Sequence, residues 1–157
     1  MPTYTVTAPE GRLSNEHKQR IAAEITRTHH EVTGAPGFFA QVIFVDVKPG
    51  NYFVGGVALA SDQLFVHGQI RAGRSADEKH RLIVRLLEAT AAATDMPKSH
   101  VWVYIVDLQP AQMVEFGHVL PEPGGEAAWT AALPAAERER MQNIGRQGAG
   151  RDYLAPA

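Results

Sequence analysis

The stretch Val42-Ile43-Phe44-Val45-Asp46 recurs in the same chain as Val103-Tyr104-Ile105-Val106-Asp107, 61 residues later. Both stretches are rich in β-branched and aromatic residues, which favour strands. With one residue of slippage the likeness extends upstream, where Gly11-Arg12-Leu13-Ser14-Asn15-Glu16 aligns with Gly73-Arg74-Ser75-Ala76-Asp77-Glu78 at an offset of 62. A repeat of this length that occurs only twice indicates the duplication of one supersecondary unit.

Each copy has the pattern strand, helix, strand. In the first, strands are expected over 3–7 and 40–47, around a helix that Ser14 caps and Gly34 ends. In the second, strands over 64–70 and 100–108 flank a helix that opens with the capping box Ser75-Ala76-Asp77-Glu78 and stops at Met96-Pro97. The apolar faces expected are Ile21, Ile25 and Val32 in the first helix, and Ile83, Leu86, Leu87, Thr90 and Ala91 in the second. A short strand is expected around 53–59, after a turn at Pro49-Gly50.

This pattern predicts an α+β fold. A β-α-β unit joins parallel strands by a right-handed crossover, so two units give a four-stranded sheet with both helices on one face. The other face would be bare and apolar, which calls for a partner subunit. We expect a single domain over 2–142, made of repeats over about 2–47 and 64–108 plus a C-terminal segment. Residues 143–157, which contain several Gly and Ala, are expected to form a disordered tail.

The composition excludes several classes of protein. The chain has 157 residues, 45% hydrophobic and 20% charged, which suits one globular domain with a sizeable core. Its formal net charge of −2, with no basic run, argues against a nucleic-acid partner. The absence of cysteine excludes disulfides, thiolate nucleophiles and Cys-ligated metals. With no signal-like or membrane-spanning apolar run, a cytoplasmic protein is expected.

Pro2 follows the initiator methionine directly. Methionine is removed before small residues, and the mature chain would then begin with the secondary amine of Pro2. Such an amine has a pKa of about 8 and can serve as an acid or a base near neutral pH. Alternatively, proline merely starts an edge strand, where it loses no ladder hydrogen bond. Position alone does not separate the two interpretations.

Four further polar residues are candidates for chemistry, each with a structural alternative. Arg71 and Arg74 leave a strand and enter a helix cap, a good place to bind a carboxylate or phosphate, although surface arginines also occur there. His29 leans toward the apolar face of the first helix and could be an ordinary core histidine, whereas the adjacent His30 is expected to be solvated. Adjacent histidines on a helix point apart, so they are a weak metal signal. Glu115 is a carboxylate flanked by apolar residues, which could raise its pKa.

Tyr104 completes the set, although an aromatic residue in an apolar strand needs no functional explanation. Together with Pro2 and the duplicated β-α-β unit, these residues resemble those of the tautomerase superfamily, and within it the cis-3-chloroacrylic acid dehalogenases. The resemblance runs from Pro2 to about Met141. The stretches that carry it are Pro2-Thr3-Tyr4, Ala40-Gln41-Val42, Phe65-Val66-His67-Gly68, Gly73-Arg74-Ser75-Ala76-Asp77, Trp102-Val103-Tyr104 and Gln112-Met113-Val114-Glu115.

The resemblance implies a homotrimer in which Pro2 lies at the bottom of each active site. Arg71, Arg74 and His29 would bind the substrate carboxylate. Glu115, helped by Tyr104, would activate water for attack on C3 of a cis-3-haloacrylate, and protonated Pro2 would protonate C2. Loss of halide then leaves malonate semialdehyde, a reaction that needs no metal or organic cofactor.

Two other functions stay open at this point. The same residues could serve a tautomerase, hydratase or decarboxylase that acts on another small unsaturated or keto acid, because a neutral Pro2 is a base. A trimeric binding protein without catalysis is the third possibility. The loop Thr33-Gly34-Ala35-Pro36-Gly37-Phe38-Phe39 differs from that expected of the dehalogenases and could alter the lid.

Overall fold

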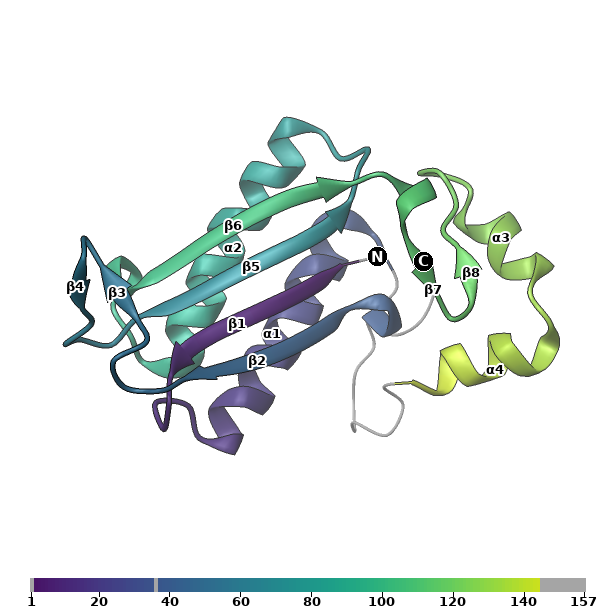
Figure 1. Cartoon of the computed structure of the whole chain (residues 1–157). Helices are drawn as coiled ribbons and strands as arrows, with labels where there is room; N and C mark the ends of the chain where they lie inside the picture. The colour runs from purple at the N-terminus through teal and green to yellow at the C-terminus, as the bar shows by residue number, and fades with distance from the viewer. Residues whose placement is uncertain (1, 36, 145–157) are drawn as a thin grey trace.

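The computed structural model describes residues 2–35 and 37–144 (Figure 1). Two β-α-β units form its body. The first consists of β1 (Thr3–Pro9), α1 (Asn15–Thr33) and β2 (Gln41–Val47); the second consists of β5 (Leu64–Arg71), α2 (Ala76–Thr94) and β6 (Val101–Leu108). The remaining strands are β3 (Phe53–Val54), β4 (Val57–Ala58), β7 (Val114–Glu115) and β8 (His118–Val119), and the remaining α-helices are α3 (Glu126–Ala132) and α4 (Ala135–Asn143). Single 3-10 turns cover Gly37–Phe39, Lys98–His100 and Pro110–Gln112.

The two units share one sheet in the order β2-β1-β5-β6. Strands are parallel within each unit, and β1 is antiparallel to β5 where the units meet. Both long helices cover the same face (Figure 1). The predicted α+β fold with two helices on one face of a four-stranded sheet is confirmed.

The caps of the two long helices fix how the copies correspond. Ser14 accepts a hydrogen bond from the backbone N–H of His17 at 3.1 Å, and Ser75 accepts one from Glu78 at 3.2 Å. Ion pairs also recur at this offset of 61, as Lys18–Asp46 at 2.8 Å and Lys79–Asp107 at 2.7 Å.

The slip between the copies therefore falls before the helix caps, since Ser14 corresponds to Ser75 and not to Ala76, as the offset of 62 had predicted. Leu82 and Leu86 take the buried places that correspond to Ile21 and Ile25. Two boundaries also differ: α2 ends at Thr94 because Asp95 adopts a left-handed conformation, and the strand predicted over 53–59 is the hairpin of β3 and β4.

The centre of the core is a close approach between β1 and β5. Tyr4 is fully buried and lies opposite Gly68 in the strand pairing. A Cβ atom at Gly68 would lie only 2.6 Å from Cε1 of Tyr4. Only glycine therefore leaves room for the tyrosine ring at this point of the sheet.

The face of the sheet opposite the helices carries large apolar side chains that one chain does not cover. Five such residues, each more than 40% exposed, are Ile43 and Val45 on β2 and Trp102, Tyr104 and Val106 on β6. A row of this size on the bare face of a sheet is typical of a subunit interface.

The C-terminal segment from the 3-10 turn at Pro110–Gln112 to α4 lies at one end of the sheet (Figure 1). Its residues Met113, Leu120, Leu133 and Met141 form a second apolar cluster with Phe39, which comes from the turn before β2. Asn143, placed in the predicted tail, ends α4, and the rest of that tail from 145 onward lies outside the described residues. Within the described residues, no helix is both long and apolar enough to cross a membrane.

Candidate active site

The pairing of β1 with β5 brings Pro2 to the arginines. Thr3 pairs with Gln69, so Pro2 lies beside the end of β5, next to Ile70 and Arg71. Side chains alternate along β1, which puts the buried Pro2 on the helix-covered face together with Tyr4. The carbonyl of Pro2 accepts a hydrogen bond from the backbone N–H of Gln41 at 3.0 Å, which anchors the strand start to β2.

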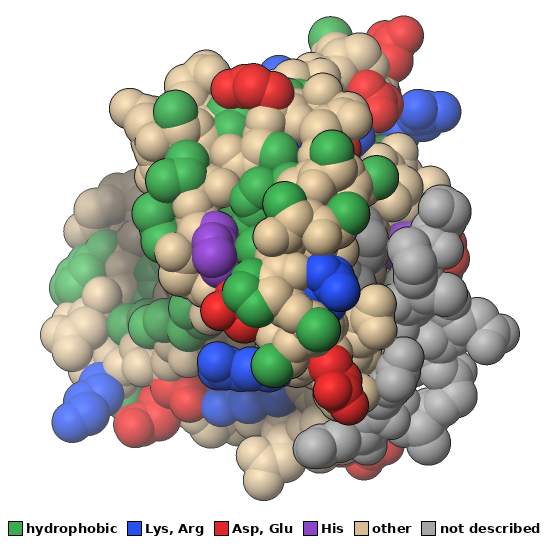
Figure 2. Space-filling model, turned by 90° about the vertical axis from the view of Figure 1, so that its right-hand side faces the viewer, with side chains coloured by type: hydrophobic (Ala, Val, Ile, Leu, Met, Phe, Trp, Pro, Cys, Tyr) green, Lys and Arg blue, Asp and Glu red, His purple; other side chains and the backbone are tan. Residues whose placement is uncertain are grey.

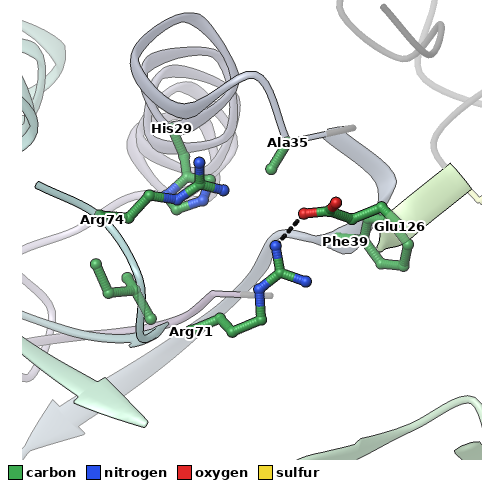
Figure 3. Close-up of a pocket in the computed structure, with 7 residues that line it drawn as sticks. His29, Ala35, Phe39, Arg71, Arg74 and Glu126 are labelled. Carbon is green, nitrogen blue, oxygen red and sulfur yellow. Dashed lines mark hydrogen bonds and ion pairs between the residues drawn. The ribbon is translucent and has the colours of Figure 1, made fainter. Parts of the chain in front are cut away.

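Arg71, Arg74 and His29 line one cavity (Figure 3). Arg71 ends β5 and is only 6% exposed; its Nη1 donates to the carbonyl of Pro121 at 3.0 Å, and its Nη2 to the carboxylate of Glu126. Arg74 donates to the carbonyl of Thr33 at 2.9 Å. Burial and the charge of Arg71 lower the pKa of the Arg74 guanidinium, against opposing effects of nearby carboxylates. Two cations so close form a strong site for an anion.

His29 is held by a buried tyrosine. The Tyr4 hydroxyl and His29 Nδ1 are 2.7 Å apart, and both side chains are almost completely buried. Burial raises the pKa of Tyr4, so its hydroxyl keeps its proton, and burial together with the Arg74 charge lowers the pKa of His29 to about 3. If Tyr4 donates to Nδ1, its buried hydroxyl proton is satisfied and the imidazole proton lies on Nε2. His29 is then a neutral donor toward the cavity.

Glu115 lies in a neighbouring hollow of about 690 Å³, which Thr3, Gln41 and Phe39 also line. It is paired with His118 across the hairpin of β7 and β8, whose turn has left-handed Phe116 and Gly117. Burial raises the pKa of Glu115, while the positive charges of the amino terminus and Arg71 oppose the rise. A carboxylate with a raised pKa is a better base near neutral pH.

Phe39 separates Glu115 from the arginine cavity. Its ring is 6% exposed and contacts the rings of Phe116 and Trp129, and it lines both hollows. Glu115 and the arginines are therefore neighbours across one aromatic wall rather than members of one cavity.

Tyr104 does not join these residues within a single chain. It lies on the uncovered face of the sheet, 56% exposed, with its ring 5.1 Å from that of Phe65. It pairs with His67, four residues before Arg71 on β5, which is about 13 Å along a strand. Tyr104 could act only if another subunit brought a site to it.

The arginine cavity continues into a more open groove of about 540 Å³ between the end of α1 and helices α3 and α4. Figure 2 faces this end of the molecule, where apolar, acidic and basic side chains are interspersed. The volume is in the range of small-molecule sites. Among the described residues, no group of three or more His, Asp or Glu side chains could hold a metal ion.

Three site residues were not found from the sequence. In the sequence, Tyr4 resembles any aromatic residue of a strand and Phe39 any core residue, so neither pattern indicates a place in the site. Glu126 follows Pro123-Gly124-Gly125 in a segment outside the repeat, and nothing in its spacing connects it with Arg71.

His30 is half-buried rather than solvated, and its Nδ1 lies 2.9 Å from the carbonyl of Ala35.

Comparison with known proteins identifies similar families and folds. The family model Tautomerase_3, described as "Putative oxalocrotonate tautomerase enzyme", matches residues 1–132. The crystal structure of N1, a member of the cis-3-chloroacrylic acid dehalogenase family, is 32% identical with a TM-score of 0.87, over 90% of this chain and 99% of that one. Native Ps01740 is 30% identical with a TM-score of 0.68, over 72% of this chain and 99% of that one. A fused 4-OT, solved as an asymmetric trimer, is 26% identical with a TM-score of 0.69, over 74% and 94%. No curated protein sequence matches.

Replacement of Tyr4 by Phe should release His29 from its fixed tautomer. The change leaves a buried Nδ1 without its donor, so we expect a loss of about 1–3 kcal/mol in the free energy of unfolding in urea. In the unaltered protein, the low pKa of His29 means that the unfolded state binds one more proton, so stability falls as the pH drops from about 6.5 to 3. Imidazole ¹⁵N NMR should show the Nε2–H tautomer of His29 in the unaltered protein and a mixture of both tautomers in Tyr4→Phe.

Tyr52→Phe is the matched control, because Tyr52 is half-buried and lies in a loop away from His29. Equal stability losses in the two variants, or an Nδ1–H tautomer in the unaltered protein, would contradict this role of Tyr4.

Proposed function

The chain belongs to the oxalocrotonate tautomerase family Tautomerase_3, and from this membership and the geometry of the site we propose that it is a cofactor-independent enzyme that dehalogenates cis-3-haloacrylates hydrolytically. The observation that carries the proposal is the cluster at one end of the sheet: two arginines and a neutral histidine around one cavity, with Pro2 beside it by strand register. The likeness to N1 supports the choice of substrate class.

In the proposed reaction, the arginines and the Nε2–H of His29 bind the substrate carboxylate. Electron density moves toward that carboxylate when water adds to C3, and the two cations stabilise the developing charge. His29 suits this role because its low pKa keeps it a neutral donor rather than a third cation.

Glu115 takes a proton from the attacking water, and the ammonium of Pro2 delivers a proton to C2. The resulting carbon bears both hydroxyl and halogen, so it expels halide and a proton and leaves malonate semialdehyde. Raised pKa at Glu115 favours its role as the base, and the Glu115 carboxylate in turn favours a cationic Pro2.

The second candidate is keto–enol tautomerisation of a small keto acid, favoured by the likeness to fused 4-OT structures. It needs the same anion site but a neutral Pro2, which would act as a base instead of an acid. Membership of an enzyme family leaves less support for the non-catalytic binding protein.

Chloride release from cis-3-chloroacrylate tests the proposal. We expect release from the cis isomer only, with losses of about 10²–10⁴-fold in Pro2→Ala and Glu115→Gln, since each removes an acid–base group. Mass spectrometry should show that active protein lacks Met1, because a retained methionine turns the Pro2 nitrogen into an amide. Absence of chloride release together with rapid tautomerisation of phenylenolpyruvate would favour the second candidate.

We further propose a homotrimer that buries the uncovered sheet face and brings Tyr104 of one subunit to the site of another. The exposed row on β2 and β6 and the distance of Tyr104 from Arg71 support this arrangement. The fused 4-OT relative is itself a trimer.

Mixing two inactive variants tests the shared site. If Glu115 and Tyr104 act from different subunits, co-refolded Glu115→Gln and Tyr104→Phe chains should regain about a quarter of the unaltered activity, because that share of sites is intact by chance. Sedimentation should show trimers in both parents. Trimers that regain no activity on mixing would mean that Tyr104 does not act across the interface.

A further inference from the structure

Glu126 occupies one side of the arginine site with its own carboxylate. Its Oε1 accepts from Nη2 of Arg71, and the two side chains face each other across the cavity in Figure 3. Arg71 is almost completely buried, whereas Glu126 is about one-third exposed toward the groove. The cavity thus holds an internal anion before any ligand arrives.

The segment that carries Glu126 is fixed from several sides. Gly73, at φ 109, packs so closely on Pro123 that a Cβ there would lie 2.4 Å from the proline Cγ. The carbonyl of Pro121 accepts from Arg71 at 3.0 Å. The indole N–H of Trp129 donates to the carbonyl of Val119 at 2.9 Å, which holds α3 onto β8. Packing and hydrogen bonds therefore fix the backbone segment that carries Glu126.

The charge of the site follows from these contacts. Arg71 and Arg74 contribute two positive charges, and ionised Glu126 removes one. Burial alone would raise the pKa of Glu126, but hydrogen bonds from Arg71 and the backbone outweigh it and lower the pKa, so the carboxylate is charged at neutral pH. His29 stays neutral. The side chains that line the cavity therefore carry one net positive charge.

The space around the arginines is equally limited. The cavity that they share with Glu126 has a volume of about 20 Å³, room for about one water molecule. The groove shares Arg74 and Glu126 with this cavity, so a ligand carboxylate can reach the arginines from the groove. A second carboxylate on the ligand would compete with the Glu126 carboxylate for Arg71.

We propose that Glu126 is a specificity-determining residue, which takes the place of a second ligand carboxylate and so restricts the site to monocarboxylates. The inference rests on the proposed function, because it assumes that the arginine pair binds the substrate carboxylate. It goes further in naming the residue that selects monocarboxylates over dicarboxylates. Dicarboxylates are excluded by like-charge repulsion at a fixed internal anion.

Calorimetric binding of two matched acids tests this role without any turnover. Acrylate is the monocarboxylate probe, and maleate, which carries a second carboxylate in the cis position, is the dicarboxylate probe. Both are titrated into the full chain at slightly alkaline pH, where they are fully ionised. In Glu126→Gln we expect the affinity for maleate relative to acrylate to rise on the order of tenfold, since one opposing charge is lost.

Glu122→Gln is the matched control, with the same change of charge on the same loop but at an exposed position. It should leave the ratio unchanged, as should Glu126→Asp, which keeps the charge. Glu126→Ala should shift the ratio in the same direction as Glu126→Gln, and thermal unfolding should confirm that all variants fold.

Two results would overturn the proposal. If acrylate binds to the unaltered protein and is lost in Arg74→Gln, while Glu126→Gln leaves the ratio unchanged or Glu122→Gln shifts it equally, this inference fails and the proposed function stands. If neither acid binds to the unaltered protein, the arginine site itself is wrong, and both fail.

Discussion

The antiparallel pairing of β1 with β5 sets the position of the whole site. It joins the two β-α-β units into one sheet, and its register places the start of β1 beside the end of β5. Pro2 thereby lies beside the end of β5, near Arg71, although the two residues are far apart in the sequence. The same pairing needs Gly68 opposite Tyr4, because a side chain there would clash with the tyrosine ring. The Tyr4 hydroxyl in turn hydrogen-bonds with Nδ1 of His29. One strand pairing thus connects the core of the protein with Pro2, with the arginine cavity and with His29.

The two copies share the features that build the sheet and its helices, whereas the candidate site residues differ between them. The caps at Ser14 and Ser75 and the ion pairs of Lys18 and Lys79 are still equivalent in the two units. At the strand ends, upstream of the caps, the copies align at an offset of 62, so Arg74 corresponds to Arg12 but Arg71 corresponds to Pro9. The pair of arginines is therefore present in the second copy only.

Much of the fold was predictable because periodicity and caps are local signals. The repeat indicated the sheet and its helices, and a slip of one residue was the main error, since caps fix a register more tightly than apolar matches do. Arg71, Arg74 and His29, which the resemblance assigns to carboxylate binding, line one cavity. Glu126 and Phe39 were not predicted, because their roles depend on how the C-terminal segment packs against the end of the sheet. That packing has no counterpart in the repeat. For Tyr104 the family resemblance suggests a role that the single chain does not explain, because the residue lies on the uncovered face of the sheet, away from the arginine cavity.

The balance of charge connects the specificity of the site with its chemistry. A neutral His29 and an internal Glu126 leave one net positive charge at the arginines, suited to one carboxylate. In the proposed reaction, Glu115 and the amine of Pro2 affect each other's protonation, and the balance decides whether the proline acts as an acid or as a base.

A crystal structure of the processed protein with acrylate bound tests this account most directly. We expect the acrylate carboxylate within hydrogen-bond distance of Arg74 and of His29 Nε2, with C2 directed at the nitrogen of Pro2 and Glu126 still on Arg71. Acrylate bound away from the arginines, or with C2 remote from Pro2, would contradict the assignment of this end of the sheet as the active site.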